Sequence, residues 1–286
     1  MKIGVSTYSL CRAIQSQEMS VTEAISYIAE IGGEHVEIVP IGFDLTESPE
    51  LIEAIRNKAA ELNIDVSNYS IGANFAGIDE QSYQLEIQRV MKEVDIASRL
   101  GVKRMRHDVA TSDDISIRQF LADLPRMADA CRQIADYAAQ YGITTSVENH
   151  GYYFQASDRI QALIHEVNRD NFKTTLDIGN FMSVDEDSVA AVKKNISYAS
   201  MIHVKDLYLR PSNQNPGEGW ILTQSGNYLR GAIVGQGDIK IREVLQIIKN
   251  SGYDGYVSIE FEGMEDCRTG TRIGLDNVKR IWNEIQ

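Results

Sequence analysis

The sequence predicts one (β/α)8 barrel, a TIM barrel, that spans residues 1–286 as a single domain. Eight predicted strands alternate with helices, and strand-then-helix alternation favours a parallel sheet that closes on itself. The chain shows no change of composition that would mark a linker between two domains. An open doubly wound sheet is the alternative, and the lack of a GxGxxG motif after the first strand weakens its dinucleotide-binding form.

The predicted strands are short runs rich in β-branched residues, which suit a pleated and buried surface. They cover residues 2–8, 34–39, 65–71, 102–107, 143–147, 173–177, 199–203 and 256–261.

The segments between the strands show apolar residues at helical spacing. These predicted helices cover residues 21–31, 48–62, 82–100, 115–141, 157–167, 186–194, 239–251 and 272–285. Ser48 and Pro49 are typical of an N-cap followed by a first helical residue, and Gly32 and Gly142 are typical stops. Pro125 is interpreted as the start of a new helix inside the fourth helical segment.

One long connection stands apart from the regular alternation. Residues 207–237 are rich in Gly, Asn and Pro and have no periodicity of their own. Loops of this length often act as lids over functional sites, so we expect an irregular lid here.

Composition narrows the compartment and the partners. No stretch approaches the roughly 20 apolar residues that span a bilayer, and the N-terminus lacks the pattern of a signal peptide. The 3 cysteines are far apart and form no CxxC pair, which fits a reducing cytoplasm. The formal net charge of −13 makes attraction to nucleic acid improbable. We therefore expect a cytoplasmic protein that binds neither membranes nor nucleic acid.

Four predicted strands end on residues that can bind a metal. They are Glu148, Asp177, His203 and Glu260. A single strand-end carboxylate more often caps the next helix or faces solvent. In a parallel barrel, however, all strand C-termini lie on one face, so the four side chains would be neighbours and could converge on one ion.

The same four positions carry a resemblance to a known family. The motifs VENHG around Glu148, LDIGN around Asp177, IHVKD around His203 and IEFEG around Glu260 resemble those of the xylose-isomerase-like barrels. This sugar phosphate isomerase/epimerase group includes ketose 3-epimerases, hydroxypyruvate isomerase and inosose dehydratase. The resemblance covers essentially the whole chain, and its motifs indicate the superfamily rather than a substrate.

The resemblance implies that these four residues bind one divalent metal ion. Three carboxylates and one imidazole form an oxygen-rich set, which favours Mn²⁺, with Mg²⁺, Co²⁺ or Zn²⁺ as alternatives. It also implies a sugar, sugar phosphate or polyol as the substrate, and barrels of this group often form homo-oligomers.

The implied reaction is isomerisation or epimerisation beside a carbonyl. Removal of a C–H proton leaves an enediolate, whose negative charge a metal stabilises. A base must take the proton and an acid must return one. By the resemblance, Glu148 and Glu260 share this work on opposite faces of the substrate. A dehydratase needs the same first step followed by loss of a β-hydroxyl, so the metal site alone fits both reactions.

Six further residues are candidates for substrate binding. Lys205 lies two residues after His203 and points to the same side of the strand, where it can donate to a substrate oxygen or pair with a carboxylate such as Asp206. The other candidates are Arg210, near a substrate-contacting arginine of the ketose epimerases, His107 at a strand end, Asn180, Glu37, and Trp220, which could cover a sugar face.

Two positions depart from the ketose epimerases. Asn180 stands where the family often has a histidine, and Tyr152, Tyr153 and Phe154 occupy the region of an additional acidic residue. The aromatic replacement indicates a less hydroxylated or differently shaped substrate than a simple ketohexose.

Three other functions compete with the isomerase or epimerase. The nearest is a dehydratase of the inosose type. The second is a hydrolase resembling the phosphodiesterases and endonucleases of this barrel, against which 5 histidines and the acidic charge argue. The third is a non-catalytic sugar-binding protein, which would tolerate the loss of a ligand more easily.

Overall fold

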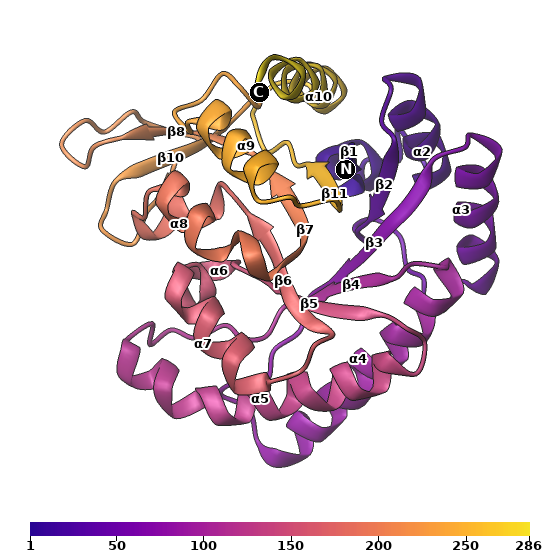
Figure 1. Ribbon diagram of the computed structural model, residues 1–286, viewed down its shortest axis with the longest axis vertical. Coiled ribbons are helices and arrows are strands. Elements are labelled where there is room, and N and C mark those ends of the chain that lie inside the picture. The colour runs from indigo at the N-terminus through magenta and orange to yellow at the C-terminus, as the bar shows by residue number, and fades with distance from the viewer.

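A computed structural model describes residues 1–286 and confirms a single closed parallel barrel surrounded by helices (Figure 1). The strand order around the barrel is β1-β11-β7-β6-β5-β4-β3-β2, and β1 pairs with both β2 and β11 to close it. The barrel strands are β1 (Lys2–Ser6), β2 (His35–Ile38), β3 (Asp65–Ile71), β4 (Arg104–His107), β5 (Thr144–Glu148), β6 (Phe172–Asp177), β7 (Ala199–Val204) and β11 (Tyr256–Ile259).

Helices follow the strands and cover the outside of the barrel (Figure 1). The principal ones are α2 (Val21–Glu30), α3 (Pro49–Glu61), α4 (Glu80–Leu100), α5 (Ile117–Ala139), α7 (Ser157–Val167), α8 (Ser188–Asn195), α9 (Ile241–Asn250) and α10 (Cys267–Glu284). Short turns of helix are η1 (Thr7–Leu10), α1 (Cys11–Gln15), α6 (Gly151–Phe154), η2 (Asn180–Val184) and η3 (Ile196–Tyr198). None of these helices combines the length and the apolar character that crossing a bilayer requires.

The two faces of the barrel strands differ in chemistry. Val147 and Ile202 alternate with Glu148 and His203 along β5 and β7, and all four side chains are buried. Because successive strand residues point to opposite faces, the apolar ones pack under the helices and the polar ones point into the barrel. The barrel axis therefore collects polar groups at its C-terminal end, inside an apolar shell.

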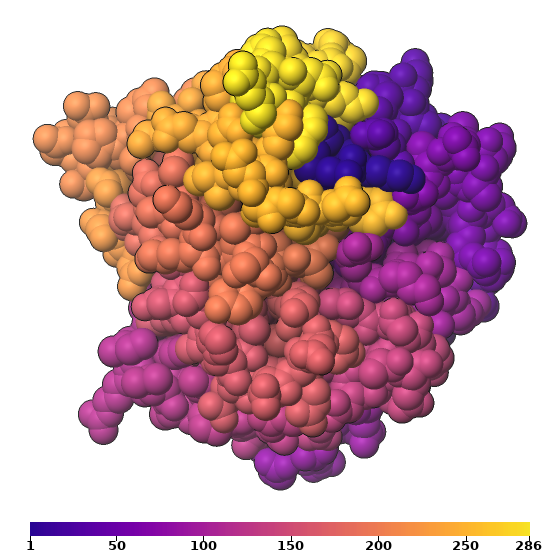
Figure 2. All heavy atoms as spheres, in the orientation of Figure 1, coloured from indigo at the N-terminus to yellow at the C-terminus, as the bar shows by residue number.

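The prediction of an irregular lid over residues 207–237 is wrong. The segment forms a separate antiparallel sheet in the order β8-β10-β9, built from β8 (Asp206–Arg210), β9 (Ile221–Leu222) and β10 (Tyr228–Ala232). It projects from the barrel and is seen in orange at the left of Figures 1 and 2.

One buried carboxylate fixes the base of this sheet. Asp206 accepts hydrogen bonds from the backbone N–H groups of Leu207, Gly235, Gly237 and Ile239. The side chain therefore ties β8 to the segment that leads into α9.

Two helix predictions also need correction. Pro125 does not begin a new helix, because α5 runs through it without a break. Helix α10 starts at Cys267, five residues before the predicted start, with Asp266 as its N-cap. Gly270 lies inside α10, where a Cβ would lie 2.4 Å from the Phe261 ring, so close packing needs a glycine there.

Candidate metal centre and active-site cavity

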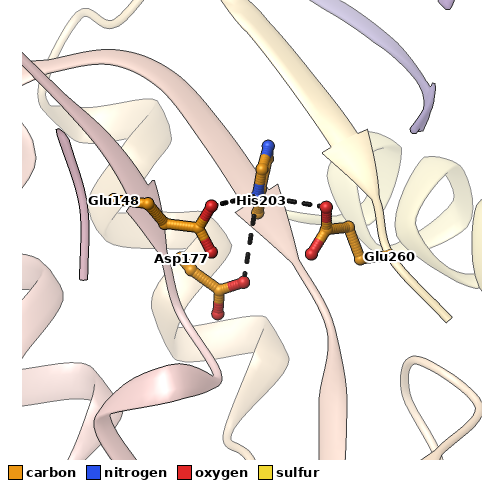
Figure 3. Close-up of side chains that lie close together, drawn as sticks. All are labelled: Glu148, Asp177, His203 and Glu260. Atoms are coloured by element: carbon orange, nitrogen blue, oxygen red, sulfur yellow. Dashed lines mark ion pairs between the residues drawn. The ribbon is translucent and has the colours of Figure 1, made fainter. Parts of the chain in front are cut away.

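The four predicted ligands converge at the C-terminal end of the barrel (Figure 3). Glu148 ends β5, Asp177 ends β6, His203 lies near the end of β7, and Glu260 directly follows β11. One ligand atom from each residue lies within 4.8 Å of every other, and all four residues are buried. One ion with metal–ligand distances of about 2.0–2.2 Å holds opposite ligands about 4.4 Å apart, so the cluster needs only a slight contraction to bind it.

The orientation of His203 tests whether the cluster suits a cation. Its Nε2 donates to the carboxylate of Glu37 at 2.9 and 3.0 Å, which turns Nδ1 toward the acidic side chains. Nδ1 is buried without a hydrogen-bond partner and lies 3.3 Å from Glu260 Oε1 and 3.5 Å from Glu148 Oε2. A neutral imidazole would aim a lone pair at carboxylate oxygens, so this position calls for a positive charge, which either a proton on Nδ1 or a metal ion can supply. The residues therefore fit a divalent metal.

The ionisation of His203 leads to the same conclusion. Burial disfavours its charged form, but the carboxylates of Glu260, Glu37 and Glu148 outweigh burial and raise the pKa of His203 well above its usual value. The centre of the cluster thus attracts positive charge.

Asp177 is held by the backbone around it. Its Oδ1 accepts from the N–H groups of Gly179 and Asn180 at 2.7 and 2.8 Å. The side chain of Asn149 bonds to both the N–H and the C=O of Asp177, at 2.9 and 2.8 Å. These bonds lock the ends of β5 and β6 together and leave Asp177 Oδ2 directed at the cluster.

A buried lysine neutralises part of the acidic charge. Lys205 Nζ lies 3.1 Å from Asp177, 3.1 Å from Glu260 and 3.0 Å from Glu262. Both expected features of Lys205 appear, since it lies on the same side as His203 and forms ion pairs, although Asp206 is not its partner.

Arg106 provides the second buried cation. Its Nε lies 2.9 Å from Glu148 Oε2, and its Nη2 donates to Asp108 at 2.7 Å. Burial opposes ionisation of Glu148, but Arg106 and His203 lower its pKa well below the usual range. Glu260 differs, because burial raises its pKa to about 7 despite the opposing charges of His203 and Lys205. The two glutamates thus differ in acidity before any metal binds.

A cavity of about 380 Å³ opens above the cluster. Glu148, His203, Lys205 and Glu260 form part of its wall. Its volume lies within the range of about 300–1,000 Å³ that is typical of small-molecule sites. Its other polar wall residues include Tyr8, Arg89, Arg106, Asp108, His150 and Glu262.

Two of the predicted substrate-binding residues support the predicted metal ligands. Glu37 is fully buried and accepts from His203, Ser70 and Asn68, which occupies its carboxylate. Asn180 Nδ2 donates to Glu148 Oε1 at 3.0 Å. Both residues therefore hold a ligand in place.

Three other predicted substrate contacts lie away from the cavity wall. His107 is fully buried beside Phe75 and Phe172 and bonds to the Asp108 carbonyl. Because side chains alternate along β4, Arg106 faces the cavity and His107 faces the helices. The predicted pocket role of His107 is therefore wrong, and alternation along the strand is the signal that would have identified Arg106.

Arg210 and Trp220 belong to the projecting sheet. Arg210 pairs with Asp238 at 3.1 Å, and its guanidinium lies 5.7 Å from the centre of the Trp220 ring. The Arg230 guanidinium lies 5.1 Å from the same ring. Trp220 thus contacts arginines, and neither Arg210 nor Trp220 lines the active-site cavity.

Comparison with known proteins defines the class. The model of the family "Xylose isomerase-like TIM barrel" matches residues 25–281, and the chain belongs to this family.

Two curated relatives are both named inosose dehydratase. The one from Geobacillus thermodenitrificans (strain NG80-2) is 23% identical over 137 residues, which are 48% of this chain and 46% of that enzyme. The one from Mesomycoplasma hyopneumoniae (strain J) is 22% identical over 265 residues, 86% of this chain and 82% of that enzyme. The first match thus spans about half the length of its relative.

Solved structures with the same fold include several enzymes. The IOLI protein with a bound zinc atom superposes with a TM-score of 0.77 at 16% identity, covering 100% of this chain and 99% of that one. D-psicose 3-epimerase in the presence of D-fructose superposes with a TM-score of 0.74 at 17% sequence identity, and 99% of each chain is covered. The probable 3-DHS dehydratase AsbF from Bacillus anthracis superposes with a TM-score of 0.73 at 16% sequence identity, covering 98% of this chain and 99% of that one. At these identities the likeness shows a shared fold, and the names include both epimerases and dehydratases.

Proposed function

We propose that this protein is a divalent-metal-dependent isomerase or epimerase that moves a proton beside the carbonyl of a sugar or polyol. The observation that carries the proposal is the convergence of three carboxylates, those of Glu148, Asp177 and Glu260, on Nδ1 of His203 at the floor of a cavity. Mn²⁺ is the proposed ion, because three of the four ligands are carboxylates. A bound divalent ion supplies positive charge that stabilises the developing enediolate.

The protein groups around the cluster support proton transfer. Glu148 and Glu260 approach His203 from two sides, as Figure 3 shows. One carboxylate removes the proton and the other returns a proton to the opposite face, which inverts the stereocentre. Lys205 Nζ, held between Asp177 and Glu260, is placed to donate to a substrate oxygen.

A dehydratase is the second candidate, and His150 favours it. His150 lines the cavity, and its Nδ1 lies 3.2 Å from Asp108 Oδ1. This contact raises the pKa of His150, so the imidazolium can protonate a departing β-hydroxyl. The names of the curated relatives point the same way.

Hydrogen exchange followed by NMR separates the two reactions. The Mn²⁺-loaded protein is incubated in D₂O with ketoses, ketose phosphates and inososes. An isomerase or epimerase exchanges the proton beside the carbonyl and forms no alkene or dione, whereas a dehydratase forms such a product. A stoichiometrically loaded protein that exchanges no proton in any of these compounds would contradict both candidates.

Substitution of Glu260 by Gln tests the catalytic role, with the bound metal measured in each sample. A Glu260→Gln protein that still binds metal and ligand should lose exchange. Retained exchange would make the protein's chemistry independent of this carboxylate and remove Glu260 from the mechanism.

A further inference from the structure

A second cavity lies beside the active site and has no part in the proposed proton transfer. It holds about 250 Å³ and lies between α6, η2 and the projecting sheet. His150 and Glu262 line both this cavity and the active-site cavity, so the two spaces share a wall. A molecule bound over the predicted metal ligands would therefore lie next to this wall.

The second cavity has an unused polar group. Gln155 is only 6% exposed, and its Oε1 is buried without a hydrogen-bond partner. A buried amide oxygen normally accepts a hydrogen bond, and this one has none, so a small rotation of the side chain toward the cavity would let it accept from a ligand. Asn180 lines the same cavity while donating to Glu148, which connects the cavity to the metal cluster.

The remaining wall is largely apolar. Leu207 and Ile221 come from the projecting sheet, and Tyr152 comes from α6. The Tyr152 hydroxyl donates to the Leu222 carbonyl and so joins α6 to β9 across the cavity. Ile221 remains 59% exposed, which leaves apolar surface for a ligand to cover.

Charge limits what this cavity can hold. No lysine or arginine lines it, and its two charged wall residues are already paired, His150 with Asp108 and Glu262 with Lys205. A phosphate or carboxylate group would therefore find no unpaired cation there. An uncharged group with an apolar face and one hydrogen-bond donor fits the wall better.

We propose that the second cavity holds an uncharged substituent of the substrate, so that the substrate is a glycoside-like sugar or polyol rather than a free sugar or a phosphorylated one. This inference rests on the proposed function for the part of the substrate that reacts. Gln155 accepts a hydrogen bond from the substituent, and Ile221 and Leu207 pack on its apolar face.

Binding of a matched pair of probes tests the cavity without requiring turnover. The affinities of phenyl β-D-glucopyranoside and D-glucose for the Mn²⁺-loaded protein are measured by ligand-observed NMR titration. The phenyl compound should bind about tenfold more tightly, because its ring is buried in the second cavity. Ile221→Asp should remove most of this advantage.

Leu85→Asp provides the matched control. Leu85 lies on α4 with 57% exposure and lines neither cavity. The control should keep the full preference for the phenyl compound. Equal affinity for the two probes, or a preference that survives Ile221→Asp, would overturn the proposal.

Deuterium exchange of ketones is measured on the same samples and tests the reaction alone. If the two probes bind equally well and the protein still exchanges protons beside the carbonyl, the role of the second cavity is rejected and the proposed function stands. A clear preference without exchange rejects the proposed function and keeps the cavity as a binding site.

Discussion

His203 donates from Nε2 to the carboxylate of Glu37, at 2.9 Å from Oε2 and 3.0 Å from Oε1. Burial works against the Glu37 carboxylate, yet His203, Ser70 and Asn68 lower its pKa to about 2, so it stays an acceptor. The pair fixes the imidazole tautomer and leaves Nδ1 as the nitrogen that can bind a metal. Carboxylate–histidine pairs of this kind are common behind metal ligands.

Glu37→Gln should weaken metal binding by about 10–100-fold, because an amide holds the imidazole less firmly and stabilises its tautomer less. The measurement is Mn²⁺ affinity by competition with a chelator. Glu47→Gln, at an exposed position, is the control. Unchanged affinity in Glu37→Gln would show that the pair does not set the orientation of the ligand.

Asp177→Asn should abolish the stabilisation of the protein by metal. Saturation of the wild type at about 100 times Kd adds about 2.7 kcal/mol to the free energy of unfolding. The expected rise in Tm is several degrees for the wild type and for the exposed control Asp170→Asn, and absent for Asp177→Asn. An equal rise in all three proteins would place the metal elsewhere.

Lys205→Met should destabilise the metal-free protein, because Asp177, Glu260 and Glu262 lose the buried cation between them. Breaking a buried ion pair costs about 3–5 kcal/mol of unfolding free energy. Urea unfolding with and without Mn²⁺ measures this loss, and the ion should restore part of it. Lys92→Met, at an exposed position, should unfold like the wild type. A Lys205→Met protein with wild-type stability would contradict the stabilising role of Lys205 as the buried cation between these carboxylates.

Two buried histidines outside the metal cluster predict the response to acid. Burial lowers the pKa of His35 and of His107 to about 4 each. In the unfolded chain a histidine gains its proton near a pKa of about 6.5, so the folded state loses stability as the pH falls from about 6.5 to 4. Each residue accounts for about 3 kcal/mol over this window, at about 1.4 kcal/mol per pH unit.

Urea unfolding at pH 7.0, 5.5 and 4.5 measures this acid response. The unfolding free energy of His107→Asn should depend less steeply on pH than that of the wild type, by the equivalent of about one proton taken up on unfolding. His165→Asn, at an exposed helical position, is the control. An unfolding free energy that stays constant over this range would contradict the neutral buried state of these histidines.

The barrel and its ligands were predictable because they follow local rules. Strand–helix alternation indicates parallel strands, and parallel strands in a barrel bring their C-terminal ends together. A charged residue at the end of an apolar run is therefore informative, as with Glu148 and Asp177. The cluster at the centre of Figure 3 required no long-range information beyond this rule.

The features that sequence reasoning missed depend on register or on distant contacts. Arg106 and His107 differ by one position along β4, and this one step decides which faces the cavity. The pairing of β8 with β10 joins segments separated by a long connection, without a tight-turn signal. Gly231 illustrates the same difficulty, because a Cβ there would lie 2.3 Å from the carbonyl oxygen of Glu262, a constraint visible only in the folded chain.

The β8–β10–β9 sheet is inserted between two neighbouring barrel strands, β7 and β11, and meets the barrel end through the bridge of Gly231 with Gly263. The four predicted metal ligands lie on barrel strands or directly after them, whereas Leu207 and Ile221 of the second cavity lie on this sheet. Under the proposed function, one wall of the second cavity therefore comes from the insertion and the reacting groups come from the barrel. A change of residue in the insertion can alter that wall without replacing any of the four predicted ligands.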